Sequence, residues 1–356
     1  MVGRFAQDIV AWQKIHGRNS LPWQNIRDPY RVWLSEIMLQ QTQVATVLDY
    51  YARFLQRFPE VADLASAQLD DVLALWSGLG YYSRARNLHR CAQAVVALHA
   101  GQFPQSSQVL QTLPGIGPST AAAIASFCFS ERVAIMDGNV KRVLTRVLAF
   151  SSDLASRKNE EQLLIVANSL LPTKNPMQTM PRYTQGVMDL GATVCTSRKP
   201  QCKICPVQMI CQGYAQGAPE TYPVKTKKLK RSVEHLNLLW AQKPDGSVWL
   251  ERRPDTGVWG GLYCLPVFAS TDALLACLPE LPDHSRLHVR YLPTFKHVLT
   301  HKDMHLSPVL TNFASCQNIM SSTDAVATGG WFLSSQWQSM GLPTPIRKLL
   351  DAGPEE

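Results

Sequence analysis

The first 212 residues carry apolar side chains at spacings of three and four, which predicts a helical region. Asp, Ser or Pro marks most of the helix starts. Asp28 can cap a first turn and Pro29 suits the first helical position, so residues 30–58 are predicted to form a helix that ends at Pro59. Further helices are predicted at residues 69–75, 83–98, 106–112, 119–127, 140–148, 159–170 and 181–190. This region is therefore expected to be all-α.

The pattern changes after Gln212. Residues 213–231 contain Gly and Pro and end in a basic run, which is typical of a solvated linker. Short β-rich runs follow at residues 235–241, 248–252, 287–292 and 304–309, with helical stretches at 272–278 and 345–352. We therefore expect a multidomain chain, with an all-α region at 1–212, a linker at 213–231 and an α+β domain at 232–356.

Composition is consistent with this division. The chain has 356 residues, enough for two or three domains of roughly 100–200 residues each. With 46% hydrophobic and 17% charged residues it is typical of soluble globular proteins and excludes a disordered chain. The net charge of +8 favours polyanionic partners without deciding for nucleic acid. Because the N-terminus has no signal pattern and no stretch is apolar enough to span a membrane, a cytoplasmic protein is expected.

The nine cysteines fall into two groups. Five are scattered in apolar surroundings and are predicted to be small core residues: Cys91, Cys128, Cys264, Cys277 and Cys316. The other four lie within one short segment: Cys195, Cys202, Cys205 and Cys211. Four such thiolates can hold a zinc ion or a cubane iron–sulfur cluster, and the spacing alone leaves both open. Three cations in the same segment can meet phosphates or offset the charge of a metal centre: Arg198, Lys199 and Lys203.

Two carboxylates stand out among the helical segments. Glu36 is a lone acid within an apolar run, where burial would raise its pKa toward the range of a general acid. Periodicity alone favours a glutamate on the wet face of an amphipathic helix. Asp137 precedes Gly138 and suits a helix N-cap, which is the reading that the residues alone favour. A fixed carboxylate can also stabilise the positive charge that develops on a sugar when a glycosidic bond breaks.

A glycine turn lies upstream of Asp137. Gly115 and Gly117 stand in a turn between two helical segments, and such a turn exposes backbone N–H groups that can hold a phosphate. With the downstream aspartate and the cysteine cluster, this turn resembles the helix-hairpin-helix (about residues 108–130) and iron–sulfur loop (195–211) of the endonuclease III superfamily of DNA glycosylases. The resemblance implies one [4Fe-4S] cluster.

The run from Leu21 to Val44 resembles the catalytic helix of the MutY-type branch, whose members remove adenine mispaired with 8-oxoguanine or guanine. The resemblance implies that Glu36 protonates adenine and that Asp137 stabilises the sugar cation. Bifunctional relatives carry a lysine nucleophile where this chain has Ser119, so a monofunctional glycosylase that uses water is expected. The expected partner is double-stranded DNA with adenine mismatches, the protein is expected to be a monomer, and no membrane association is expected.

The same resemblance assigns residues that contact DNA. Gln41 and Tyr81 match positions that wedge into the duplex, and Gln185 matches a position facing the adenine edge. Core packing remains an equal alternative for Tyr81 and for its neighbour Tyr82, and a plain surface role for Gln185. The remaining DNA-binding positions implied are Gly115, Gly117, Ser119 and Asn139.

The C-terminal region resembles a Nudix domain through residues 251–254 and 257–266. Residues 270–277 lack the acidic helix that binds magnesium in Nudix hydrolases, so the resemblance is to the non-hydrolytic lesion-recognition domain of MutY-type proteins. Thr300 and His301 match the loop that probes oxidised guanine, while Leu299 replaces an aromatic residue of that loop. His301 also fits a plain exposed histidine. A glycosylase-lyase, a nucleotide hydrolase and a non-enzymatic DNA-binding protein remain as rival functions.

Overall fold

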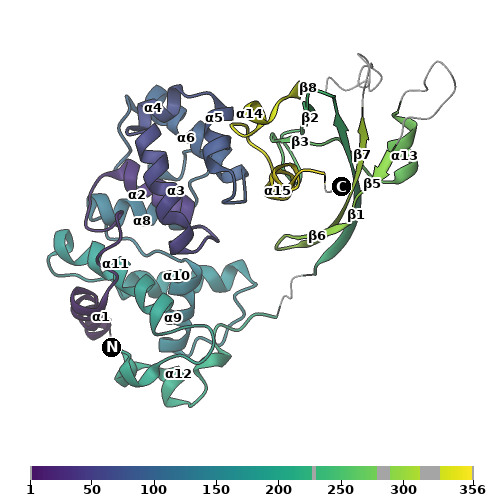
Figure 1. The fold of residues 1–356 in the computed structure, drawn as a ribbon. Helices are drawn as coiled ribbons and strands as arrows, with labels where there is room; N and C mark the ends of the chain where they lie inside the picture. Colours follow the sequence, from purple (N-terminus) through teal and green to yellow (C-terminus); the bar gives the residue numbers. More distant parts are fainter. Residues whose placement is uncertain (1, 227–229, 279–288, 313–328, 355–356) are drawn as a thin grey trace, which may run out of the picture. The chain divides into compact units, whose positions relative to one another are not determined.

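The computed structural model describes residues 2–226, 230–278, 289–312 and 329–354. Its contacts divide the chain into two compact units (Figure 1). The first unit consists of Met1–Ser66 and Arg90–Lys228, and the second of Ala67–His89 and Leu229–Glu356. The short stretch 67–89 thus belongs to the second unit, although the residues before and after it belong to the first.

The first unit is helical, as predicted from the apolar periodicity. Its helices are α1 (Val2–His16), α2 (Pro29–Leu39), α3 (Val44–Arg57), α4 (Val61–Ser66), α7 (Ser107–Leu110), α8 (Pro118–Phe129), α9 (Gly138–Leu148), α10 (Arg157–Ser169), α11 (Pro176–Thr193) and α12 (Gln212–Ala215). Helix α6 (Ser83–His99) begins in the second unit and ends in the first. Among the described residues, no helix is both long and apolar enough to cross a membrane.

The single helix predicted over residues 30–58 is wrong, because α2 and α3 are separate helices. Gln41 lies between them with a left-handed backbone (φ 57°), and the Gln40 N–H bonds to the Ile37 carbonyl to close α2. Both helices bury apolar faces, so the helical spacing of apolar residues continues from α2 into α3. No Gly or Pro marks the break between them, which is why the sequence pattern predicted one helix. The N-terminus of α2 is as predicted, since the Asp28 side chain accepts hydrogen bonds from the Tyr30 and Arg31 N–H groups.

Helix α11 also differs from its predicted start. It begins at Pro176, and Pro181 lies inside it. Proline has no N–H to donate, which leaves the carbonyl of Met177, four residues earlier, without its helical partner. That carbonyl accepts hydrogen bonds from Arg27 Nη2 (2.6 Å) and Ser130 Oγ (3.3 Å) instead, and this exchange explains how the proline is tolerated.

The second unit contains a mixed sheet, which confirms the α+β prediction. The strands run in the order β3 (Tyr263–Cys264), β2 (Val248–Arg252), β1 (Ser232–Gln242), β7 (Lys302–Asn312) and β5 (Val289–Tyr291). In addition, β4 (Val267–Phe268) pairs with β1, β6 (Phe295–Val298) with β7 and β8 (Gly329–Phe332) with β2. Strands β1 and β7 are parallel. The helices of this part are α13 (Thr271–Ala276), α14 (Ser334–Trp337) and α15 (Thr344–Ala352).

The second unit also holds α5 (Leu69–Trp76) and the turn that follows it. Ser77 Oγ and the Tyr82 hydroxyl both donate to the Leu342 carbonyl at 3.1 Å, and Asp70 forms an ion pair with Arg252 at 3.3 Å. The helical periodicity of residues 67–89 predicts the helices there, but it does not predict that they pack with the C-terminal part of the chain. An amphipathic pattern specifies which face of a helix is buried and leaves open which element covers it.

The scattered cysteines behave largely as core residues. Cys91, Cys128 and Cys264 are buried, which agrees with the prediction. Cys277 is half-buried near the end of α13, so it is not a core residue. Cys316 lies outside the described residues.

Candidate active site

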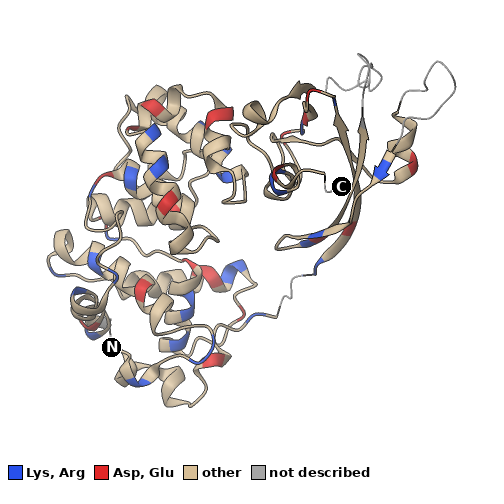
Figure 2. Ribbon diagram, viewed as in Figure 1, with Lys and Arg blue, Asp and Glu red and all other residues tan. Residues whose placement is uncertain are grey.

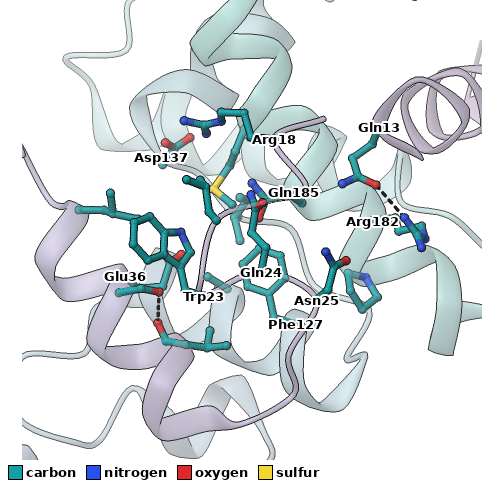
Figure 3. Close-up of a pocket in the computed structure, with 18 of the residues that line it drawn as sticks. Gln13, Arg18, Trp23, Gln24, Asn25, Glu36, Phe127, Asp137, Arg182 and Gln185 are labelled. Carbon is teal, nitrogen blue, oxygen red and sulfur yellow. Dashed lines mark hydrogen bonds between the residues drawn. The ribbon is translucent and has the colours of Figure 1, made fainter. Parts of the chain in front are cut away.

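The first unit contains a cavity of about 1060 Å³ (Figure 3). It is lined by α2, α8, α11, the start of α9 and the segment that connects α1 to α2. Six residues that the sequence analysis singled out line it together: Glu36, Gln41, Ser119, Asp137, Asn139 and Gln185. They come from segments up to 149 residues apart in the chain, so the fold brings one candidate site together from separate motifs.

Glu36 lies on α2, and its neighbours Ser35 and Ile37 are buried. Burial and, to a smaller extent, the negative charge of Asp137 together raise the pKa of the Glu36 carboxyl to about 7. The carboxyl is therefore partly protonated at neutral pH, as a general acid requires. The alternative of a glutamate on a wet helix face does not agree with this environment.

Asp137 caps α9 and lines the same cavity. One oxygen accepts a hydrogen bond from the Val140 N–H (2.7 Å) and the other from Asn139 Nδ2 (3.2 Å). Arg142 Nη2 in turn donates to Asn139 Oδ1 at 2.8 Å, which orients the Asn139 amide. The cap and the cavity position coexist, because one fixed carboxylate serves both. Two carboxyls in contrasting environments are the arrangement that divides acid and anion roles between them.

The sequence analysis missed a buried carboxylate beside this cavity. The Asp189 side chain is fully buried and accepts hydrogen bonds from Arg18 Nε (2.7 Å), the Arg18 N–H (3.0 Å) and Gln185 Nε2 (2.9 Å). Because the Gln185 amide nitrogen is held by Asp189, its oxygen is the end available to accept from a ligand. Asp189 stands within an apolar stretch of α11, the same signal that drew attention to Glu36.

Gln24 was missed as well. It lines the cavity, and both polar atoms of its amide are buried without a hydrogen-bond partner among the described residues (Figure 3). A buried amide of this kind costs about 1–3 kcal/mol unless a ligand or water binds it. Its amide can therefore bind water or a polar group of a molecule in the cavity. No local sequence pattern distinguishes this glutamine from the others in the chain.

Comparison with known proteins identifies the family. The family model described as HhH-GPD superfamily base excision DNA repair protein matches residues 34–168, and a NUDIX domain model matches residues 237–352. An adenine DNA glycosylase of Buchnera aphidicola subsp. Schizaphis graminum is 34% identical over 347 residues, which cover 98% of each chain. The chain belongs to the adenine DNA glycosylase family.

Two further proteins are similar to part of this chain. The mouse adenine DNA glycosylase is 45% identical over 222 residues, covering 60% of this chain and 42% of the mouse protein. A solved thermostable thymine-DNA glycosylase superimposes with a TM-score of 0.51 at 26% identity, covering 60% of this chain and 95% of that one. The helical fold is thus the one shared with other DNA glycosylases.

The predicted hairpin joins α7 to α8 and matches the superfamily motif. Gly115 has a left-handed backbone (φ 76°), and Gly117 is the N-cap residue of α8. Both glycines are exposed, which leaves their backbone accessible to a phosphate. Ser119 lies in the first turn of α8 and lines the cavity. Lys14 of α1 also lines the cavity, and its side chain is exposed.

The four clustered cysteines of this chain line one small cavity. Cys195 follows α11, and the other three lie in or next to the short 3₁₀ turns Cys202–Ile204 and Gln208–Ile210. Among the described residues no three His, Cys, Asp or Glu side chains are placed to hold a metal ion. Four thiols that line a common space are a donor set that either a zinc ion or an iron–sulfur cluster can take.

Two arginines of α9 support this loop. Arg146 is buried and donates to the carbonyls of Thr196 (2.6 Å) and Ser197 (2.9 Å), with Nη1 also 3.4 Å from Cys195 Sγ. Arg142 Nε donates to the Cys195 carbonyl at 2.8 Å. A cation held beside the thiols offsets the negative charge that thiolates would bring to a buried site.

The residues expected at the lesion lie in different parts of the molecule. Gln41 lines the cavity of the first unit, whereas Tyr81, Thr300 and His301 belong to the second. Tyr81 is exposed, with a left-handed backbone (φ 48°), while Tyr82 is buried. The core-packing alternative therefore applies to Tyr82 and not to Tyr81. Lys and Arg residues are spread over both units (Figure 2), so charge alone does not mark the DNA-binding face.

Proposed function

We propose that this chain excises adenine paired with 8-oxoguanine or guanine in double-stranded DNA, by acid-assisted hydrolysis of the N-glycosidic bond. The observation that carries the proposal is the pair of carboxyls in one cavity, Glu36 with a pKa raised to about 7 and Asp137 held by two hydrogen bonds. Membership of the adenine DNA glycosylase family supports adenine as the base.

The chemistry follows from the two environments. Adenine leaves the base stack and enters the cavity, where the Glu36 carboxyl donates its proton to ring nitrogen N7. The bond between the sugar C1′ and N9 then breaks, and its electron pair goes to the protonated purine. The positive charge left on the sugar is stabilised by the Asp137 carboxylate. A water molecule adds to C1′ and loses its proton to a cavity carboxylate, which yields an abasic site.

Ser119 supports a reaction that stops at the abasic site, because a hydroxyl cannot form the Schiff base of a lyase. Lys14 is the amine that remains to be tested, since it lines the cavity. Borohydride should trap no stoichiometric protein–DNA adduct with the wild type. If an adduct forms and disappears in Lys14→Gln, the chain has lyase chemistry and the monofunctional assignment is wrong.

The proposed substrate is tested by incubating the protein with duplexes that carry each possible mispair, followed by alkaline cleavage at abasic sites. Strand breaks should appear at adenine opposite 8-oxoguanine and opposite guanine. Excision of another base, or of none, would refute the proposal. Magnesium-dependent release of phosphate from free nucleotides would instead favour a Nudix-type hydrolase.

We expect purified protein to be yellow-brown and to contain about four irons per chain, because thiolate-to-iron charge transfer absorbs visible light. The four clustered cysteines would each hold one iron, and the cluster would stabilise the loop between residues 195 and 211 rather than take part in the chemistry. Metal analysis and the visible absorption spectrum check this expectation. A colourless protein that contains one zinc per chain would contradict it.

The loop that follows β6, residues 299–301, should contribute to recognition of the oxidised base. We expect His301→Ala to lower the ratio of single-turnover rates for adenine opposite 8-oxoguanine and opposite guanine, on the scale of one or two hydrogen bonds, about 1–3 kcal/mol. Leu299→Ala should change the ratio less, since an aliphatic side chain cannot hydrogen-bond the lesion. Equal effects of both substitutions would show that the loop acts through packing alone.

A further inference from the structure

The turn that presents Tyr81 is held by the second unit, the one that contains the C-terminal sheet. On one side, Ser77 and Tyr82 both hydrogen-bond to the Leu342 carbonyl. On the other, Arg86 donates to the carbonyls of Gly260 and Asp255, the latter at 3.2 Å. The family model that matches the helical part includes this turn, yet its contacts place it with the domain that is proposed to read the lesion.

The Tyr81 side chain is contacted at its ring and at its hydroxyl group. The Arg84 guanidinium lies 5.5 Å from the centre of the Tyr81 ring and is anchored to the Leu79 and Gly80 carbonyls at 3.2 Å. The Tyr81 hydroxyl hydrogen-bonds to Thr300 Oγ1, 219 residues further along the chain. The ring is thus exposed but fixed in direction, which lowers the entropy cost of inserting it between bases.

Thr300 is presented by a loop whose main chain is also fixed. Its carbonyl accepts a hydrogen bond from Arg231 Nη1 (2.9 Å), and the Leu299 N–H donates to the Lys302 carbonyl (2.8 Å). The His301 carbonyl accepts from the Ser232 N–H at 3.1 Å, which ties the loop to the start of β1. The hydroxyl that Tyr81 contacts therefore moves only with the lesion-reading loop.

We propose that Thr300 is a positioning residue that acts through Tyr81, so that insertion of the Tyr81 ring into the duplex is coupled to the reading of the opposite base by His301. This inference rests on the proposed function. If the Tyr81 ring moved independently of the loop, it would insert beside any adenine mispair. A Tyr81 ring that is hydrogen-bonded to the loop inserts fully only where the loop binds 8-oxoguanine. The hydroxyl pair would then contribute to discrimination between 8-oxoguanine and guanine and not to the chemical step.

A double-mutant cycle in the full-length protein tests the coupling. Tyr81→Phe and Thr300→Val each remove one hydroxyl and keep the shape of the side chain. The readout is the ratio of single-turnover rates on adenine opposite 8-oxoguanine and opposite guanine. We expect each single substitution to lower this ratio about two- to tenfold, the scale of one hydrogen bond, and the double variant to be no worse than either.

Two controls separate coupling from damage to the fold. Thr300→Ser keeps a hydroxyl and should restore the wild-type ratio. Thr294→Val removes another exposed threonine hydroxyl of the same unit, one that bonds to Ser307 Oγ at 2.8 Å, and should leave the ratio unchanged.

The inference is overturned if the two losses add, or if Thr300→Val lowers the ratio while Tyr81→Phe does not. The second outcome would mean that Thr300 contacts the lesion directly. Wild-type protein that excises no adenine would refute the proposed function, and the inference with it, whereas an active and discriminating wild type with additive losses refutes the inference alone.

Discussion

Glu36→Gln should bind mispaired DNA and fail to excise adenine. The substitution keeps the size of the side chain and its capacity for hydrogen bonding but removes the proton that the purine must receive before it can leave. Loss of a positioned general acid typically lowers the rate by about 10²–10⁴-fold. Single-turnover kinetics on adenine opposite 8-oxoguanine, together with a binding measurement on the same duplex, separates the two effects.

The pH dependence provides an independent check of the same role. Because the pKa of Glu36 is raised to about 7, the acid is protonated below neutral pH and the single-turnover rate should fall as pH rises above about 7. Glu36→Gln should lose this descending limb. Activity that is largely retained in the variant, or a wild-type rate that stays constant through pH 8, would remove Glu36 from the mechanism.

Replacing Glu36 should abolish activity without lowering stability. The folded protein holds Glu36 in its protonated form up to about pH 7, whereas an unfolded chain ionises it near 4.5. As pH rises through this interval the unfolded chain ionises while the folded protein keeps the proton, so stability falls, and the full cost is present above about pH 7. At pH 8 the Tm of Glu36→Gln should be no lower than that of the wild type, so inactivity could not be attributed to unfolding.

Asp137→Asn is expected to lower the excision rate by about 10²–10³-fold, the usual effect of removing one preorganised electrostatic group. Asparagine is also a good N-cap, so α9 should keep its cap on Val140 and the protein its Tm. The loss would thus report on the charge and not on the helix. The measurement is the single-turnover rate at saturating enzyme, beside a thermal unfolding curve.

A second consequence distinguishes this variant from a merely damaged one. The Asp137 charge contributes to the raised pKa of Glu36, so its removal should move the descending limb of the pH–rate profile to lower pH. A limb that stays at the wild-type pH would mean that the two carboxyls do not interact. An excision rate close to that of the wild type would mean that the sugar cation is stabilised by another group.

The catalytic roles of Glu36 and Asp137 are predicted by the resemblance of the surrounding runs to a known family. The residues alone favour a wet helix face for Glu36 and a helix cap for Asp137. Like Glu36, Asp189 stands within an apolar stretch, but its partners Arg18 and Gln185 come from distant segments or the next turn, so its role is visible only in the fold. Gln24 has no local signal, because only the surrounding cavity leaves its amide without a partner.

Apolar periodicity and turn residues by themselves determined the all-α and α+β regions and most helix bounds, and the spacing of the cysteines determined the segment that carries the cluster, because these depend on neighbours in the chain. The tertiary structure decided what depends on distant partners: the break at Gln41, where two buried faces share one periodicity, and the placement of residues 67–89 in the second unit. It alone joined Tyr81 to Thr300, since a hydrogen bond across 219 residues has no counterpart in any local pattern.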